Sequence, residues 1–201
     1  MIDSKNKFME YLFQDDNIIT STEVNNQQLE ILKNLGSLNS IQNIDNRLFT
    51  PNNYVINDYL ARQLVLQNGI YCNQTALYLW KLTDSFDFEV NMAFRQGYLL
   101  PKIRFERWTD NLKVKQIRSP LLNQDIEKIS VEGTKKTIKL YSRERTLIDI
   151  LNKKSLVDAE EIQQAFKAYM NSKYKDLNKL FTVAQRMNKE EKIRNTLGVI
   201  L

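Results

Sequence analysis

The N-terminal fold is decided by residues 18–50, which read IITSTEVNNQQLEILKNLGSLNSIQNIDNRLFT. Thr20 and Glu23 stand three residues apart, the spacing of a capping box, and predict a short helix that begins at Thr20. After a tight connection, leucines at helical spacing predict a further helix, which Gly36 is placed to end. The stretch therefore predicts two helices joined by a short turn.

Elements on either side complete the pattern. Residues 5–14 predict a preceding helix, because apolar side chains recur along it at helical spacing. Short strands are expected at 38–41 and 47–50, around the polar turn 43–46. Helix, short helix, helix and a two-stranded flap are the order of a winged helix-turn-helix, which the sequence predicts as a DNA-binding domain over residues 1–53.

The last helix of this predicted domain carries the candidate base-reading residues. Gln27, Gln28 and Lys33 are expected on its outer face. Glutamine recognises adenine edges well, and the N-terminal residues of a recognition helix usually make the base contacts. The alternative is a small helical domain whose polar face only meets solvent.

The distribution of charge along the chain does not favour DNA binding by the N-terminal domain alone. Residues 1–58 hold four Lys/Arg against eight Asp/Glu, a net charge of −4, whereas the remaining 143 residues carry +9. Duplex DNA attracts proteins mainly through neutralisation of its phosphates by Lys and Arg. We therefore expect the N-terminal domain to need phosphate contacts from elsewhere in the chain.

Residues 54–201 predict a second domain. Two helices are expected at 58–67 and 73–82, and a region with a period of two residues follows from 86 to 141. Capping residues then predict helices to the end of the chain. The predicted fold class is α+β, with an N-terminal winged helix-turn-helix and a C-terminal domain that has a small mixed or antiparallel sheet and a helical tail.

The period-two region also holds most of the positive charge. Residues 95–155 contain 15 Lys/Arg and seven Asp/Glu. Strands are expected at 86–92, 103–105, 112–117 and, as a hairpin, at 126–131 and 137–141. If these strands pair, basic residues on their outer faces form a surface suited to phosphates, and otherwise an ordinary solvated face. The residues of this predicted basic face are Lys102, Arg104, Arg107, Lys113, Lys115, Arg118, Lys135, Lys136 and Lys139.

Several kinds of site are absent from the sequence. The chain has no histidine, which excludes Ser-His-Asp and Cys-His nucleophilic sites and His-based metal sites. There is no Walker motif or GxGxxG motif. Asp87 and Glu89 share one predicted strand face, as in metal nucleases, but without a second-strand acidic-x-Lys they are expected to be solvent-facing or salt-bridged. We expect no catalytic residue, no metal and no cofactor.

Two features point to the compartment. Cys72 is the only cysteine, so an intrachain disulfide is impossible, and we expect a packed core thiol in a reducing cytoplasm. The N-terminal residues lack the apolar core of a signal peptide, and no stretch approaches the length of a membrane span. A cytoplasmic protein without a membrane partner is therefore predicted.

Arg143 and Arg145 open the predicted helical tail. Arg145 and Asp149 are i, i+4 neighbours on a helix and are expected to pair, with a contribution of only a few tenths of a kcal/mol if exposed. We interpret this pair as a structural tie between helix and sheet. A ligand-binding role for either arginine stays open.

Three runs of sequence resemble the AbiEi family of antitoxins from abortive-infection systems. The run YSRERTLIDIL at Tyr141–Leu151 is similar to the segment that links sheet to helices in that family. Residues 61–82, ARQLVLQNGIYCNQTALYLWKL, resemble the opening of its second domain, and DAEEIQQAFKAYM followed by LNKLF fits its tail. With the winged-helix order, the resemblance spans nearly the whole chain.

The resemblance implies a type IV antitoxin and transcriptional autorepressor, active in abortive infection and antiviral (phage) defence. Its N-terminal winged helix would bind inverted repeats of double-stranded DNA in its own promoter, with Gln27, Gln28 and Lys33 on the reading helix and Arg47 on the wing. Its C-terminal domain would counteract a nucleotidyltransferase toxin without forming a stable complex. Self-association on DNA is left open. The alternatives are an enzyme that modifies the toxin, such as an atypical kinase, and a direct toxin-binding module.

Overall fold

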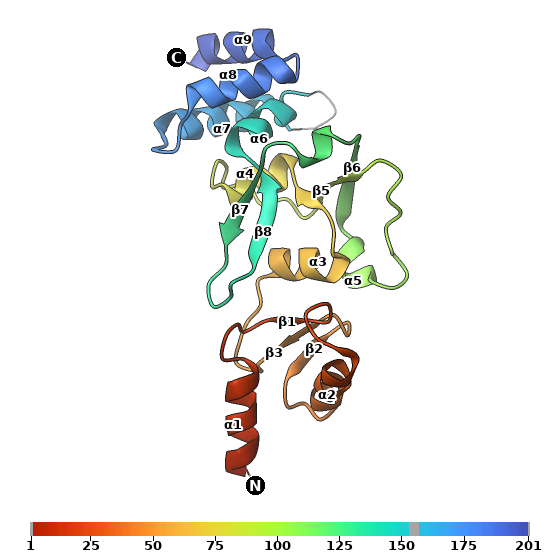
Figure 1. The fold of residues 1–201 in the computed structure, drawn as a ribbon. Coiled ribbons are helices and arrows are strands. Elements are labelled where there is room, and N and C mark those ends of the chain that lie inside the picture. The colour runs from red at the N-terminus through yellow and green to blue at the C-terminus, as the bar shows by residue number, and fades with distance from the viewer. Residues whose placement is uncertain (1, 153–156, 201) are drawn as a thin grey trace. The chain divides into compact units, whose positions relative to one another are not determined.

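We describe the protein from a computed structural model, which defines the structure of residues 2–152 and 157–200 (Figure 1). It is an α+β protein with two small sheets and a C-terminal helical tail, which confirms the predicted fold class at that level. The chain forms two compact units. Unit 1 comprises Met1–Asn68, Pro101–Thr109 and Lys128–Ile138, and unit 2 comprises Gly69–Leu100, Asp110–Glu127 and Lys139–Leu201.

Unit 1 is assembled from three separate segments of the chain, so its limits differ from the predicted domains 1–53 and 54–201. A three-stranded antiparallel sheet in the order β1-β3-β2 packs on α2, around a core of Phe13, Leu32, Ile41 and Phe49. The elements of this unit are α1 (Ile2–Leu12), β1 (Ile19–Thr20), α2 (Asn26–Ser37), β2 (Gln42–Ile44), β3 (Leu48–Thr50), α3 (Asp58–Leu66) and α5 (Glu106–Thr109).

The predicted short helix at Thr20 is wrong. One hydrogen bond of its capping box forms, because Glu23 Oε2 accepts from Thr20 N at 2.8 Å, but Glu23 N donates to the backbone oxygen of Thr20 at 3.0 Å and not to its hydroxyl. Residues 21–24 are nevertheless turns, since Thr20 belongs to β1 and pairs there with Leu48 of β3. The capping box that starts α2 is formed instead by Asn25 and Gln28.

The two-stranded flap is present, with its second strand at the expected residues and its first strand four residues later than expected. The predicted strand 38–41 is wrong, because Leu38 ends α2 and Asn39 has a positive φ of 52°. The strands are β2 and β3, joined by residues 45–47, of which Asp45 and Asn46 have positive φ angles of 51° and 53°. We call the β2–β3 hairpin the wing.

Unit 2 is built on a mixed sheet with the strand order β6-β5-β4-β8-β7. Strand β4 is antiparallel to β5 and parallel to β8, and β5 is parallel to β6. Strand β7 begins in unit 2 and strand β8 ends there, but residues 128–138, which include the tip of their hairpin, belong to unit 1. The elements are β4 (Ile70–Tyr71), α4 (Asn73–Leu79), β5 (Val90–Arg95), β6 (Leu112–Ile117), the 3-10 helix η1 (Leu121–Asn123), β7 (Ile126–Ser130) and β8 (Thr137–Tyr141).

The expected strand over Phe86 and Phe88 is wrong. Strand β5 begins at Val90, and both phenylalanines are exposed. Asp87 Oδ1 accepts a hydrogen bond from Glu89 N at 3.0 Å, which bends the backbone before the strand. Alternation of apolar and acidic residues therefore does not mark a strand here.

The helical tail of unit 2 follows its predicted caps. It consists of α6 (Arg143–Ile150), α7 (Ala159–Asn171), α8 (Leu177–Arg186) and α9 (Glu190–Ile200). Ser142 caps α6 by accepting from Arg145 N, and Asp158 caps α7 by accepting from Glu161 N. The helices lie next to one another in Figure 1, and buried apolar side chains from all four belong to one core. In the part of the chain that the structure defines, we find no helix both long enough and apolar enough to cross a membrane.

Candidate functional site

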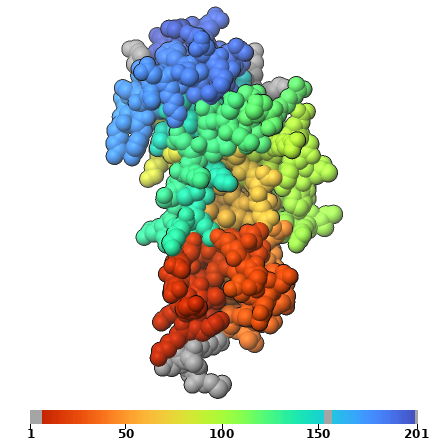
Figure 2. All heavy atoms as spheres, viewed as in Figure 1, coloured from red at the N-terminus to blue at the C-terminus, as the bar shows by residue number. Residues whose placement is uncertain are grey.

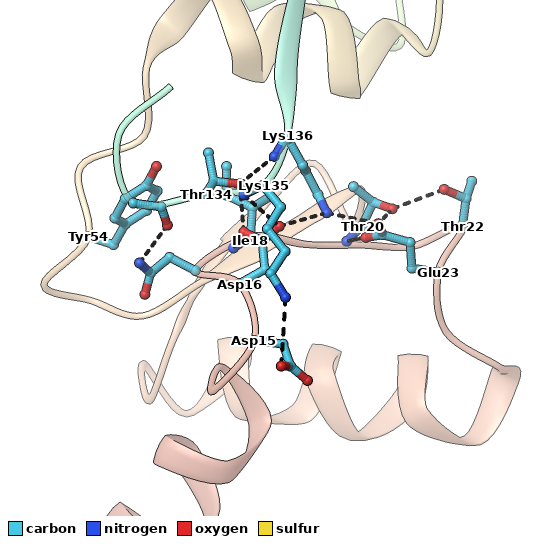
Figure 3. Close-up of polar contacts among 12 residues, drawn as sticks. Asp15, Asp16, Ile18, Thr20, Thr22, Glu23, Tyr54, Thr134, Lys135 and Lys136 are labelled. Atoms are coloured by element: carbon cyan, nitrogen blue, oxygen red, sulfur yellow. Dashed lines mark hydrogen bonds and ion pairs between the residues drawn. The ribbon is translucent and has the colours of Figure 1, made fainter. Parts of the chain in front are cut away.

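The tip of the β7–β8 hairpin is bound to the N-terminal segment through a group of charged residues (Figure 3). Lys136 Nζ lies 2.8 Å from Glu23 Oε1 and 3.4 Å from Asp16 Oδ2. Asp16 also accepts from Thr134 Oγ1 at 2.6 Å. We call Asp16, Glu23, Thr134 and Lys136 the tip clamp. It joins residues about 120 positions apart within unit 1.

Backbone groups of the hairpin turn complete this contact. Tyr54 donates its hydroxyl hydrogen to Glu132 O at 2.9 Å, and Asn17 Nδ2 donates to Gly133 O at 2.7 Å. Figure 2 shows the blue-green atoms of the hairpin tip against the red atoms of the N-terminal segment. The hairpin tip is therefore an integral part of unit 1.

Gly133 is the position in this turn that tolerates no side chain. Its φ is +75°, and an added Cβ would lie 2.7 Å from Cε2 of Tyr54. We expect Gly133→Ala to lower the free energy of unfolding of unit 1 by about 1–2 kcal/mol, because the backbone strain adds to the displacement of Tyr54. Urea unfolding measures this effect, with the exposed Gly97→Ala as control: it has a similar φ of +83° but open space around its Cβ. Equal losses in the two variants would contradict the packing argument.

The tip clamp keeps its two carboxylates charged. Burial acts to raise the pKa of Asp16, but hydrogen bonds from Thr134 and from Ile18 N, together with the charge of Lys136, outweigh it and leave the pKa below the ordinary value. Burial acts in the same direction on Glu23, and its hydrogen bonds from Lys136 and Thr20 again lower the pKa overall. Both groups are thus anions at neutral pH.

The negative charge of the N-terminal segment is balanced by positive charge within unit 1. Unit 1 contains eleven Lys/Arg and ten Asp/Glu, a net charge of +1. Its two later segments, 101–109 and 128–138, bring six of the eleven cations. The acidic N-terminal segment is therefore neutralised inside its own unit.

Three arginines gather on aromatic rings beside the wing. The guanidinium carbons of Arg47 and Arg104 lie 5.3 and 5.1 Å from the centre of the Phe105 ring, and that of Arg107 lies 4.8 Å from the Trp108 ring. Both rings are buried. We call Arg47, Arg104 and Arg107 the wing arginine cluster. An arginine held over a ring face is oriented and remains open to an anion.

A hydrogen bond fixes the position of this cluster on the wing. Trp108 Nε1 donates to Asp45 Oδ2 of the wing turn at 2.5 Å. None of the three arginines forms an ion pair with a carboxylate of residues 2–152 or 157–200, and neither does Lys102, which is also exposed. The cluster is therefore a concentration of positive charge available to an outside partner.

The predicted strand under Lys102, Arg104 and Arg107 is wrong. Residues 102–104 form turns, and Arg107 lies on α5. Phe105 is buried while Ile103 is fully exposed, so the alternation does not reflect the two faces of a strand. These residues are not part of the sheet of unit 2 but belong to unit 1.

The candidate reading residues lie on α2. Gln27 is exposed in its first turn. Gln28 is exposed too, but its Oε1 accepts from Asn25 N at 3.0 Å, so the side chain is used in the helix cap. Lys33 pairs with Glu30 at 3.0 Å. Of the three, Gln27 is the residue whose amide the helix itself does not use.

The other members of the predicted basic face have partners. Lys113 pairs with Glu89 at 2.9 Å on β6, Lys115 with the buried Asp149 at 3.1 Å, and Lys135 with Asp15 at 3.7 Å. The remaining two are Arg118, whose Nε donates to Gln96 Oε1 at 3.1 Å, and Lys139, which is exposed on β8. The predicted basic face is thus divided. Its residues near the wing form no ion pair with a carboxylate in the defined part of the chain, whereas Lys113, Lys115, Lys135 and Lys136 each do.

A buried charge network lies under the first tail helix in unit 2. Arg145 and Asp149 of α6 are 3% and 2% exposed, and Arg145 Nε donates to Asp149 Oδ2 at 3.2 Å. Lys115 from β6 lies 3.1 Å from the second oxygen of Asp149, and Asp125 lies 3.8 Å from Arg145 Nη1. The pair is formed as predicted, but it is buried, and it ties helix to sheet.

Arg143 is held nearby in unit 2 between two rings. Its guanidinium carbon lies 3.8 Å from the centre of the Trp80 ring and 4.5 Å from that of Tyr174. Its Nη1 is 3.8 Å from Glu127 Oε2. Both rings that contact this guanidinium group belong to unit 2 itself, which favours a structural role for Arg143.

Cys72 is a buried thiol, and the Asp87–Glu89 pair lies at the surface. Cys72 is fully buried, and burial raises the pKa of its thiol to about 12, as expected for a core thiol. Glu89 is salt-bridged to Lys113. Within residues 2–152 and 157–200, no three His, Cys, Asp or Glu side chains are grouped to hold a metal ion.

The comparisons with known proteins add no family assignment. No protein-family model matches the chain, and a search of curated proteins gives no match. The resemblance to AbiEi antitoxins therefore remains a prediction. Sequence reasoning did not identify Asp16, Phe105 or Trp108 as site residues. It placed Phe105 on a strand, and the turn at Glu132–Thr134 predicted a hairpin without indicating what its tip would contact.

Proposed function

We propose that this chain is a non-enzymatic regulator that binds duplex DNA, and that it acts as the autorepressor and antitoxin of an AbiE-type operon. The observation that carries the DNA-binding part is the wing arginine cluster, three guanidinium groups beside the wing without carboxylate partners in the defined part of the chain. Phosphate contacts position a protein on DNA, and guanidinium groups bind phosphate oxygens in a bidentate manner.

The proposal assigns the two tasks of DNA recognition to unit 1. Gln27, in the exposed first turn of α2, would contact base edges in the major groove, as in winged helix-turn-helix proteins. Arg47, Arg104 and Arg107 would contact the phosphates that flank it. The phosphate contacts then come from segments 101–109 and the wing, in place of the sheet lysines that pair with carboxylates.

The test is a salt series on two duplexes. The full chain is titrated by fluorescence anisotropy against its own promoter and against random DNA of equal length. The double variant Arg104→Ala/Arg107→Ala is expected to weaken binding to both duplexes about tenfold or more and to reduce the slope of log K against log salt by about 1.8, since each lost phosphate contact removes about 0.9. Lys113→Ala is the control, because Lys113 already pairs with Glu89.

Each part of the proposal has its own contrary result. Equal affinity for promoter and random DNA would contradict the proposal that the chain is a sequence-specific repressor. If the double variant left the slope of log K against log salt unchanged and Lys113→Ala reduced it, the phosphate contacts would be assigned to the sheet of unit 2 and not to the wing arginine cluster.

The antitoxin part rests on the family resemblance. It predicts that co-expression of this chain restores growth to cells that express the nucleotidyltransferase encoded beside it, and that the two proteins do not co-purify. Stable co-purification would favour a direct toxin-binding module, and an ATP-dependent mass increase of the toxin would favour a modifying enzyme.

A further inference from the structure

The turn before α5 presents an isoleucine to solvent. Residues 101–105 form this turn, which is closed by a hydrogen bond of 3.0 Å from Phe105 N to Pro101 O. Ile103 lies in the middle of the turn and is 102% exposed. Single apolar side chains are common on protein surfaces, so exposure alone does not indicate a function. The charged residues around Ile103 distinguish it from the others.

Cations flank Ile103 on both sides. Lys102 precedes it and Arg104 follows it, both are exposed, and neither forms an ion pair with a carboxylate of residues 2–152 or 157–200. Arg107 lies on α5, which begins directly after the turn. An apolar side chain between two such cations suits a ligand that carries anions around an apolar interior. Duplex DNA has this arrangement, because two chains of phosphates enclose the stacked bases.

Buried aromatic rings hold this turn in place. Phe105 at its end and Trp108 on α5 are both buried. The guanidinium group of Arg47 lies over the Phe105 ring, and Asp45 accepts a hydrogen bond from Trp108 Nε1, so the turn is fixed against the wing. Thr109 Oγ1 also donates to Phe105 O at 3.0 Å. A side chain on a turn that is already ordered can enter a ligand with little further loss of backbone entropy.

We propose that Ile103 inserts between two stacked base pairs of the bound duplex from the minor groove, while Lys102 and Arg104 contact the phosphates on either side. This inference deepens the proposed function and rests on it. Isoleucine is among the residues that act as wedges in minor-groove binding, where new contacts offset the free energy of unstacking. Pyrimidine–purine steps unstack most easily, so Ile103 would add sequence preference at a step that no hydrogen bond reads.

An anionic membrane is the other partner that a basic turn with an apolar tip could fit. One isoleucine buries too little apolar surface for stable attachment, since even a whole myristoyl chain binds membranes only marginally. Binding to DNA does not depend on that apolar area, because contacts of Lys and Arg with phosphates supply much of the affinity. The size of the apolar tip therefore favours a single base step.

The first experiment uses the fluorescence of 2-aminopurine, which stacking quenches. The full chain is added to a set of promoter duplexes in which 2-aminopurine replaces one adenine at a time. The fluorescence is expected to rise at a defined base step. This rise is expected to be lost in Ile103→Ser and kept in Ile103→Leu, whose side chain can still act as a wedge. The matched control is Val55→Ser, which should keep the rise, because Val55 is 90% exposed in unit 1 but stands between uncharged neighbours.

The second experiment separates the wedge from the charges around it. Ile103→Ser removes no charge, so the slope of log K against log salt is expected to stay unchanged, whereas Arg104→Ala/Arg107→Ala reduces it. The affinity of Ile103→Ser for the promoter is expected to fall by about three- to tenfold, because the apolar burial that is lost is partly offset by the unstacking that is avoided. A reduced slope in Ile103→Ser would show that the variant disturbs the phosphate contacts and would contradict the wedge.

The possible results distinguish this inference from the proposed function. A wild type that does not bind its promoter contradicts both. A wild type that binds without a rise in fluorescence at any position, or an equal rise in Ile103→Ser, contradicts the wedge alone and leaves DNA binding in place. If the wild type but not Ile103→Ser sediments with phosphatidylglycerol vesicles, and no fluorescence rise occurs on DNA, the tip would be assigned to a lipid surface instead.

Discussion

Asp149→Asn is expected to lower the free energy of unfolding of unit 2 by about 3–5 kcal/mol, because it leaves the buried guanidinium of Arg145 with only the carboxylate of Asp125, 3.8 Å away. Lys115 loses the same partner, but it is partly exposed and can turn to solvent. The measurement is urea unfolding followed by tryptophan fluorescence. In a Trp108→Phe background Trp80 is the only tryptophan, and it lies in unit 2.

Two further variants separate burial from charge pairing. Lys113→Met breaks the exposed pair with Glu89 and is expected to cost about 0–1 kcal/mol. The double variant Arg145→Met/Asp149→Leu replaces both buried charges by apolar side chains, and much of the stability is expected to return. A loss in Asp149→Asn no larger than in Lys113→Met would show that the network does not stabilise unit 2.

Lys136→Met is expected to lower the free energy of unfolding of unit 1 by about 1–3 kcal/mol at neutral pH. The methionine keeps the stem but leaves Asp16 and Glu23 without their cation. Trp108 reports this unit in a Trp80→Phe background. The adjacent Lys135→Met is the matched control, since Lys135 is 74% exposed and lies 3.7 Å from an exposed Asp15; its expected loss is a few tenths of a kcal/mol.

The loss in Lys136→Met should depend on pH. The pKa values of Asp16 and Glu23 are lowered in the folded chain, so their contribution is fully present above the ordinary values of 3.8 and 4.5 and disappears as the pH falls through the folded values. The wild type and the variant should therefore differ by a constant amount from about pH 5.5 to 7 and converge only once the pH has fallen below the lowered folded values of both carboxyl groups. If the wild type and Lys136→Met still differ in free energy of unfolding in acid, the loss would be due to packing of the side chain and not to its charge.

Local signals predicted the helices of this protein well. Ser142 and Asp158 cap α6 and α7 as expected, because a cap depends only on residues within one turn. The same locality explains the failure at Thr20 and Glu23. Glu23 accepts from Thr20 N as in a capping box, yet pairing of Thr20 with β3 holds the chain in a turn, and no pattern within residues 20–24 could indicate that.

Contacts between distant segments were not predictable from patterns of charge. The positive charge of residues 95–155 suggested one basic face, but Lys136 lies in the tip clamp and Lys115 in a buried network. Arg104 and Arg107 appeared to belong to a strand, because Ile103 and Phe105 alternate with them. Only the burial of Phe105 and Trp108 reveals that this segment packs beside the wing.

The division of unit 1 among three segments has a consequence for synthesis on the ribosome. Residues up to Asn68 are made first, but Lys136 and Thr134, which hold Asp16 and Glu23, belong to a segment that ends at Ile138. At 5–20 residues per second, roughly 4–14 s pass between these points. During that interval the nascent chain lacks the cation that pairs with Asp16 and Glu23, and at first it also lacks the buried rings of Phe105 and Trp108. We expect it to be protease-sensitive until the hairpin emerges, and any fragment that stops short of Ile138 to retain that immature state permanently.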